Sequence, residues 1–209
     1  SMIIGTAGFT AALALLRMRD NHQRPELGPI AVTGATGGVG MLATDIFSRA
    51  GYAVHAISGK ADRAGFLEAL GAAKVIDRHE LELGGKPLET VRFGGALDNA
   101  GGEWLARLLA CTAPCGNVAS VGLAADSALA TTVMPFIIRG VNLLGIASAG
   151  TARDAREQVW RHLASDWKPA HLDTICTREV ALDELPNVFG HMLAGGSFGR
   201  TLVRIGGEA

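Results

Sequence analysis

The chain has 209 residues, of which 48% are hydrophobic and 19% are charged. A chain of this length and composition buries a substantial core, which excludes intrinsic disorder and favours a globular fold. The formal net charge of -1 gives no basis for binding nucleic acid or an acidic membrane surface through bulk charge.

The apolar opening of the chain predicts a helix of a folded domain and not a membrane span. Apolar residues recur at helical spacing over Thr6–Arg19, and we expect the Thr6 hydroxyl to cap this helix. Glycine and threonine residues interrupt the run and charged residues end it, so it is too short to cross a bilayer. A polar connection that contains proline, Asn21–Pro29, follows.

Short apolar runs then alternate with helical patterns. The expected strands are Ile30–Thr33, Tyr52–Ile57, Lys74–Ile76, Gly95–Asp98, Asn117–Val121 and Asn142–Ile146. The expected helices are Gly38–Ala50, Arg63–Leu70, Glu103–Ala110, Pro135–Arg139 and Ala152–Leu163. This alternation predicts an α/β fold with a doubly wound parallel sheet of the Rossmann type. The right-handed crossover rule favours the strand order 3-2-1-4-5-6.

The chain divides into two parts by this pattern. Residues 1–165 form the expected nucleotide-binding domain, and residues 166–209 form a less regular C-terminal tail. The tail contains the segment Thr174–Val180, to which no structure is assigned, and is expected to form a helix at Leu182–Leu193 and a strand at Thr201–Ile205.

The stretch Pro29–Gly40 carries the strongest functional signal. An apolar strand is closed by four glycines and is followed by a helix, which is the pattern of a loop that holds a pyrophosphate at a helix N-terminus. Ala35 stands where the dinucleotide fingerprint has its first glycine, and it is small enough to keep the tight turn. Gly37 lets the main chain approach the phosphates, and Gly40 lets the helix pack on the strand.

The end of the second expected strand indicates which dinucleotide binds. NAD enzymes place an acid there to bind the ribose hydroxyls, but this chain has Ser58, Gly59 and Lys60. A hydroxyl and a cation suit the 2′-phosphate of NADPH, which an acid would repel. Arg78, at the end of the third strand, supplies a second positive charge. The alternative is that Lys60 only lies solvated in a turn.

Further residues lie at the carboxyl edge of the sheet without forming a catalytic group. The segments 98–101 and 121–123 are placed to line the nicotinamide side, although an acid such as Asp98 often caps the next helix. Tyr52 is the single tyrosine, and no Tyr-x-x-x-Lys motif exists. The six histidines are scattered. We therefore assign no catalytic residue.

The cysteines do not predict a metal site. Cys111 and Cys115 lack the second pair of ligands that zinc needs, and Cys176 stands alone. Three cysteines without a secretory pattern are typical of reduced thiols in a cytoplasmic protein.

Four segments give the chain a resemblance to a known family. They are Met2–Ala11, Thr33–Gly40, Thr131–Arg139 and Gly199–Val203. Together they resemble the acrylyl-CoA reductase group of the zinc-independent medium-chain dehydrogenase/reductases, the quinone oxidoreductase-like family.

This resemblance implies an NADPH-dependent reduction of an activated C=C bond, with acryloyl-CoA or a quinone as substrate. It implies cofactor contacts at Thr36, Gly37, Gly38, Val39, Ser58, Gly59, Lys60, Arg78, Leu123, Ile137 and Ser148. The family often has Arg where Lys60 stands, and the segment Ala194–Phe198 lacks the amide side chain of relatives. The resemblance also implies a homodimer paired through the edge strand, Asn142–Ile146.

The family further has a GroES-like domain that supplies a tyrosine near the nicotinamide and much of the substrate pocket. We expect this chain to be the cofactor-binding part of such an enzyme, so that catalysis by the chain alone stays an open question. Zinc-independent alcohol dehydrogenase activity of the intact parent is an alternative. Two non-catalytic roles also stay open, an NADPH-binding sensor or interaction module and a structural dimerisation domain whose loop binds nothing.

Overall fold

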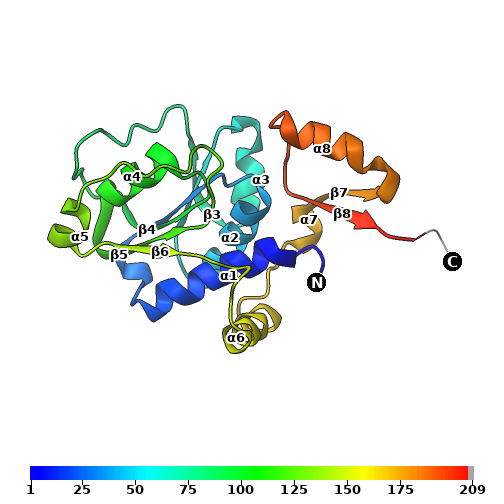
Figure 1. The fold of residues 1–209 in the computed structure, drawn as a ribbon, viewed down its shortest axis with the longest axis horizontal. Helices are drawn as coiled ribbons and strands as arrows, with labels where there is room; N and C mark the ends of the chain where they lie inside the picture. The colour runs from blue at the N-terminus through cyan, green and yellow to red at the C-terminus, as the bar shows by residue number, and fades with distance from the viewer. Residues whose placement is uncertain (207–209) are drawn as a thin grey trace.

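The computed structural model describes residues 1–206 and contains a six-stranded parallel sheet in the order β3-β2-β1-β4-β5-β6 (Figure 1). Its strands are β1 (Ile30–Thr33), β2 (Val54–Ser58), β3 (Ala72–Asp77), β4 (Phe93–Asp98), β5 (Thr112–Ser120) and β6 (Asn142–Gly145). The predicted strand order is therefore confirmed. Every residue of β1 is buried, as expected for the central strand of a sheet covered on both faces.

Helices cover both faces of this sheet. They are α1 (Gly5–Asp20), α2 (Gly38–Arg49), α3 (Ala64–Ala69), α4 (Gly102–Cys111), α5 (Met134–Arg139) and α6 (Arg153–Ala164). One buried cluster joins α1, α2 and α6, and it includes Phe9, Phe47 and Leu163. A second cluster joins α4 to β2 and β4 through residues such as Leu108 and Ile57. Short 3-10 turns lie at Pro25–Leu27 and Ala61–Arg63.

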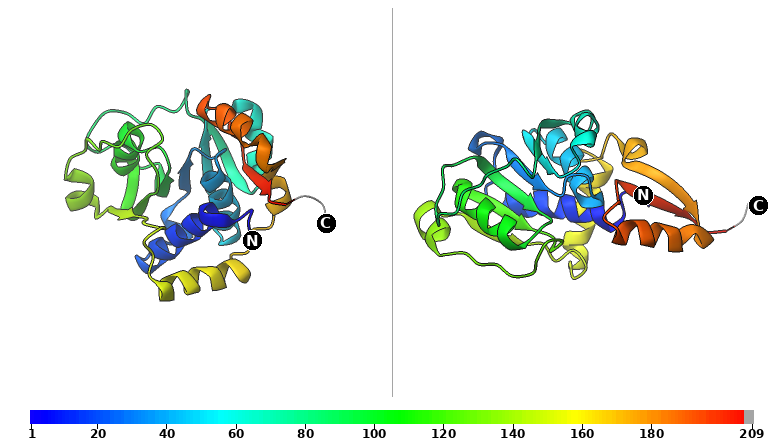
Figure 2. Two further views of the ribbon diagram at one scale, coloured as in Figure 1. Left: turned by 45° about the vertical axis from the view of Figure 1, so that its right-hand side comes forward. Right: turned by 90° about the horizontal axis from the view of Figure 1, so that it is seen from above.

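The C-terminal tail forms a small separate sheet. It consists of α7 (Leu172–Ile175), β7 (Cys176–Ala181), a 3-10 turn (Leu182–Glu184), α8 (Leu185–Leu193) and β8 (Arg200–Arg204). Strands β7 and β8 pair in parallel. Figures 1 and 2 show this unit beside α3 and the N-terminus, on one side of the main sheet. Residues 207–209 of the expected tail lie outside the described residues.

Two local predictions were wrong. Helix α1 begins at Gly5 with Ile4 at the N-cap and no side-chain cap, so Thr6 does not cap it; the Thr6 carbonyl instead accepts a hydrogen bond from the Thr10 hydroxyl at 2.7 Å. Strand β5 begins at Thr112, five residues before the predicted start at Asn117. A register shift between Phe93 and Gly95 separates these first residues of β5 from the regular ladder, which hides them from a pattern search.

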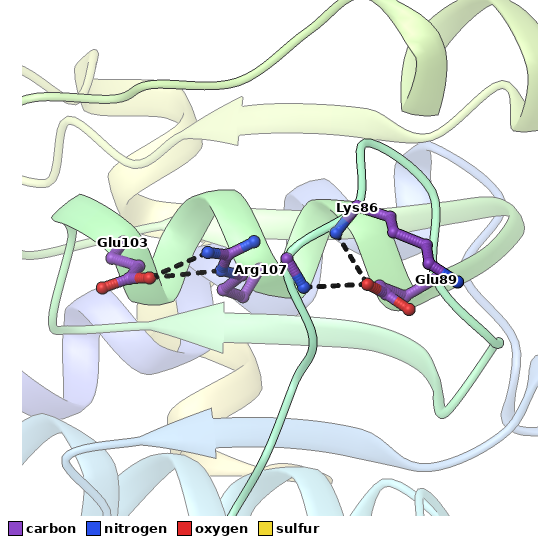
Figure 3. A network of polar contacts seen from close by, with 5 residues as sticks. Lys86, Glu89, Glu103 and Arg107 are labelled. Carbon is purple, nitrogen blue, oxygen red and sulfur yellow. Dashed lines mark hydrogen bonds and ion pairs between the residues drawn. The ribbon is translucent and has the colours of Figure 1, made fainter.

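The loop between β3 and β4 lies against α4 (Figure 3). The Glu89 N–H of the loop donates a hydrogen bond to the Ala110 carbonyl of α4 at 3.0 Å. Glu89 accepts hydrogen bonds from the backbone N–H groups of Gly85 and Lys86, at 2.9 and 2.7 Å, and the bond from Lys86 lowers the pKa of Glu89. On α4, Arg107 pairs with Glu103 at 2.9 Å. The loop and the outer face of α4 therefore lie side by side.

Cys111, Cys115 and Cys176 are free, and burial raises the pKa of the Cys111 thiol to about 11. None of the helices within residues 1–206 has both the length and the apolar character needed to cross a membrane.

Candidate functional site

A cleft of about 600 Å³ opens at the carboxyl ends of the central strands, where ligands bind in doubly wound sheets. It is lined by Thr33, Gly34, Thr36, Gly37, Gly38, Val39, Gly40, Ile57, Ser58, Gly59, Lys60, Arg78, Asn99, Ala100, Trp104, Ala124, Ala125, Gly195 and Ser197. Among these described residues there are two cations and no Asp or Glu. The cleft is therefore suited to a negatively charged ligand.

The glycine loop lines the cleft and is packed too closely to accept a side chain at Gly40. Gly34 has φ +59°, and its carbonyl accepts a hydrogen bond from the Gly37 N–H at 2.9 Å, which closes the turn. A Cβ at Gly40 would lie 2.3 Å from that same carbonyl oxygen. The prediction that Gly40 permits close packing of the helix on the strand is confirmed, and Ala35 fits fully buried inside the turn.

Helix α2 points its free amides into this cleft. Its N-cap is Gly37, and no side chain caps the first turn. The unsatisfied N–H groups of a helix N-terminus, together with the helix dipole, favour an anion at this place. The uncapped backbone amides at the start of α2 are therefore suited to binding a pyrophosphate.

The ends of β2 and β3 bring the two predicted cations to one side of the cleft. The buried Ser58 hydroxyl accepts a hydrogen bond from the Lys60 N–H at 3.0 Å and lies 3.3 Å from the Thr36 hydroxyl. A Cβ at Gly59 would lie 2.5 Å from Arg78 Nε, so the Arg78 side chain passes directly over Gly59. The serine thus fixes the turn that presents Lys60 beside Arg78.

The C-terminal tail closes the same side of the cleft. The Lys60 ammonium donates a hydrogen bond to the Ser197 carbonyl, and the Gly199 N–H donates to the Thr36 carbonyl at 3.1 Å. The Phe198 ring packs on Phe66 with the centroids 4.8 Å apart. Residues far apart in the sequence therefore build one wall.

Arg200 adds a cation that sequence reasoning missed. Its Nε donates to the Ile3 carbonyl at 3.1 Å, and a Cβ at Gly38 would lie 3.2 Å from its Nη1. The guanidinium therefore lies at the N-termini of both α1 and α2. Its positive charge adds to that of the α2 dipole and favours an anion at this helix end. Its position in the chain, about 160 residues after the loop, gives no local sign of this placement.

Asp98 has a structural role. It is fully buried, accepts a hydrogen bond from the Thr33 hydroxyl at 2.7 Å and receives the Gly101 N–H at 2.7 Å. The carboxylate thus organises the backbone before α4, as an acid at a strand end often does. Asn99, which sequence reasoning placed only generally, lines the cleft and donates its amide to the Thr33 carbonyl at 2.7 Å.

The structure brings most, but not all, of the predicted contact residues together. Eight line the cleft: Thr36, Gly37, Gly38, Val39, Ser58, Gly59, Lys60 and Arg78. Three do not line it: Leu123, Ile137 and Ser148. Leu123 and Ile137 are 67% and 74% exposed. Trp104 lines the cleft and was not predicted, because its spacing after β4 matches no motif.

The described part of the chain offers no metal centre. Within residues 1–206, no three side chains of His, Cys, Asp or Glu come together in a group that could hold a metal ion.

The sequence matches known dehydrogenases and reductases over most of its length. Residues 38–165 match the family model described as zinc-binding dehydrogenase. The chain is 40% identical over 206 residues to the acrylyl-CoA reductase AcuI of Ruegeria pomeroyi, covering 98% of this chain and 62% of that protein. It is 43% identical to YhfP of Bacillus subtilis, provisionally named a quinone oxidoreductase, with the same coverage. The chain thus spans less than two thirds of the length of these relatives.

Solved structures give the same result. The YhdH oxidoreductase of Salmonella enterica in complex with NADP aligns with a TM-score of 0.92 at 40% identity, over 98% of this chain and 63% of that one. YhfP of Bacillus subtilis with NAD bound aligns with a TM-score of 0.93 at 43% identity, over 98% and 62%. The family model matches more than half of the chain. The chain therefore belongs to the zinc-binding dehydrogenase family.

Proposed function

We propose that this chain binds NADPH in the cleft above the glycine loop. The observation that carries the proposal is the pair of cations, Lys60 and Arg78, on the side of the cleft where the adenosine ribose would lie, with no acid among the lining residues. The solved structure of the YhdH relative with NADP supports it. The bound nucleotide would supply a hydride, while the chain's own residues hold and orient it.

Each part of the cofactor has a matching group in the cleft. The free amides of Gly38 and Val39 in the first turn of α2 would bind the pyrophosphate, with Arg200 adding charge from the tail. The Ser58 hydroxyl and the Lys60 and Arg78 side chains would bind the 2′-phosphate through charge-assisted hydrogen bonds. The Lys60 ammonium has three donors, so a phosphate can bind to it beside the Ser197 carbonyl. Leu123, Ile137 and Ser148 stay proposed contacts from the family resemblance.

We propose that the whole protein reduces the activated C=C bond of an enoyl thioester similar to acryloyl-CoA, with a quinone as the alternative substrate. The names of the relatives support both. The described residues that line the cleft include no Tyr, His, Cys, Asp or Glu. A group outside this lining that donates the proton would fit the proposed reaction, whereas a sensor or interaction module would need NADPH binding alone.

Three further properties are proposals. The domain boundary at 165/166 is supported by the end of α6 at Ala164 and the separate β7–β8 sheet. Homodimer formation through β6 is supported by its place at the edge of the sheet. A cytoplasmic location is supported by the free cysteines.

The test is the affinity for NADPH and NADH, measured by calorimetry on the chain and on a Lys60→Ala variant. Loss of a charged hydrogen bond to the 2′-phosphate should weaken NADPH binding about ten- to a hundredfold. NADH, which lacks that phosphate, should bind Lys60→Ala as it binds the unmodified chain. Lys86→Ala is a matched control, because Lys86 lines a different cavity.

Two outcomes would contradict the proposal. Equal small losses for both nucleotides would reject the role of Lys60 in binding the 2′-phosphate. No binding of NADPH at millimolar concentration would reject the cofactor itself and favour a structural dimerisation domain. Oxidation of NADPH in the presence of acryloyl-CoA, followed by absorbance, separates an active reductase from a binding module.

A further inference from the structure

Trp104 is the one aromatic side chain among the described residues that line the cleft. It lies in the first turn of α4 and is half-buried, with one part packed against the cluster that contains Ile57 and Leu108. Ile57, at the end of β2, also lines the cleft. The exposed part of the indole therefore belongs to the cleft wall on the α4 side.

The proposed nucleotide brings its adenine base to this side. In NADPH the base and the 2′-phosphate are attached to the same ribose, so a phosphate held by Lys60 and Arg78 leaves the base within one sugar of that pair. The pyrophosphate would occupy the glycine loop and the amides of α2, so the base must lie elsewhere in the cleft. Outside the glycine loop, the apolar residues that line the cleft are Ile57, Ala100, Trp104, Ala124 and Ala125, of which Ile57 and Trp104 have the largest side chains.

Part of the indole is fixed before any ligand binds, because Trp104 is half-buried and packs against the cluster that contains Ile57 and Leu108. An aromatic ring fixed by its surroundings loses little freedom when a base stacks on it.

We propose that Trp104 is the platform on which the adenine base of the nucleotide stacks, and that it sets the affinity for the adenosine half of the cofactor. This inference rests on the proposed function. A purely structural role is the competing explanation, because Trp104 also packs against the apolar cluster under α4. The two explanations differ in which ligands lose affinity when Trp104 is substituted.

The experiment compares Trp104→Ala, Trp104→Phe and the unmodified chain with three ligands: NADPH, adenosine 2′,5′-bisphosphate and reduced nicotinamide mononucleotide. Loss of base stacking should weaken the two adenine-containing ligands by the same factor, about tenfold. The mononucleotide, which has no adenine, should bind all three proteins alike. Phenylalanine keeps an aromatic face, so Trp104→Phe should stay within about threefold of the unmodified chain.

A spectroscopic measurement makes the test independent of folding losses in Trp104→Ala. Adenosine 2′,5′-bisphosphate should change the indole emission of the unmodified chain and of Trp160→Phe, but not that of Trp104→Phe. Trp160 packs on Phe9 with the ring centroids 5.9 Å apart, and Trp167 stacks on His162 at 4.0 Å, so neither lines the cleft.

The outcomes separate this inference from the proposed function. If NADPH binds but Trp104→Ala binds adenosine 2′,5′-bisphosphate normally, or if the emission change persists in Trp104→Phe, the stacking role is overturned. If the unmodified chain binds neither NADPH nor the bisphosphate, the proposed function fails and this inference fails with it.

Discussion

Gly40 shows how a single residue decides whether the cleft can exist. A Cβ there would approach the Gly34 carbonyl oxygen to 2.3 Å and Ala35 Cα to 2.7 Å, and both are backbone atoms that cannot move aside cheaply. The substitution would push α2 away from β1. The same shift of α2 would displace the first-turn amides that we propose bind the pyrophosphate.

Gly40→Ala should therefore lower the free energy of unfolding by about 1–3 kcal/mol and weaken NADPH binding. Gly65→Ala is the matched control, because Gly65 lies in α3 and a Cβ added there would meet no atom within 4 Å. That control should be neutral or stabilising by about 0.5–1 kcal/mol, since alanine favours a helix more than glycine does. Denaturant unfolding measures both, and equal stability of the two variants would contradict the steric argument.

At the scale of elements, a buried carboxylate on helix α2 joins the C-terminal tail to the main domain. Asp45 of α2 is fully buried and accepts the backbone N–H groups of Ala170 and His171, at 3.2 and 2.9 Å. His171 Nδ1 lies 3.3 Å from Asp45 Oδ2 but makes no hydrogen bond. The backbone amides therefore hold the carboxylate, and through it the start of the tail is fixed on α2.

Asp45→Ala should lower the free energy of unfolding by about 1–3 kcal/mol, because it leaves two amides without their acceptor. It should also expose the segment before α7 to limited proteolysis. Asp166→Ala removes a carboxylate that is paired with His162 on the surface, so it should have a much smaller effect. Unchanged stability and protease resistance of Asp45→Ala would show that the tail is held by its apolar contacts alone.

At the scale of the whole molecule, the free edge of the sheet predicts the assembly. Strand β6 pairs with β5 on one side, and nothing within residues 1–206 pairs with its other side. Leu143 on this strand is 36% exposed, and Ile137 and Ile138 on the neighbouring α5 are 74% and 59% exposed. An apolar, unpaired edge of this kind favours pairing with a second copy.

Light scattering should give roughly twice the chain mass of 21.6 kDa at micromolar concentration. Leu143→Lys places a charge on the pairing edge and should shift the mass towards that of one chain. Leu193→Lys, at a position on α8 that is 91% exposed, should leave the mass unchanged. A single-chain mass for the unmodified protein would reject pairing through β6.

The fold was largely predictable because its signals are local. The buried run Ile30–Thr33 and the positive-φ glycines Gly51 and Gly71 after their helices mark strand and helix ends within a few residues of one another. Where long-range pairing decides, the sequence was less informative. The early start of β5 depends on its register with β4, and the N-terminus of α1 depends on packing and not on the hydroxyl of Thr6.

By itself, the sequence determined the order of strands and helices, the glycine loop and the cations that follow β2 and β3. Each of these features depends on residues that are close together in the sequence. The tertiary structure decided which distant residues share the cleft: it placed Trp104, Ser197 and Arg200 beside the loop and left Leu123 and Ile137 exposed. The physical reason is that a binding surface is assembled by packing between elements. The spacing of residues along one element does not show which other elements pack beside it.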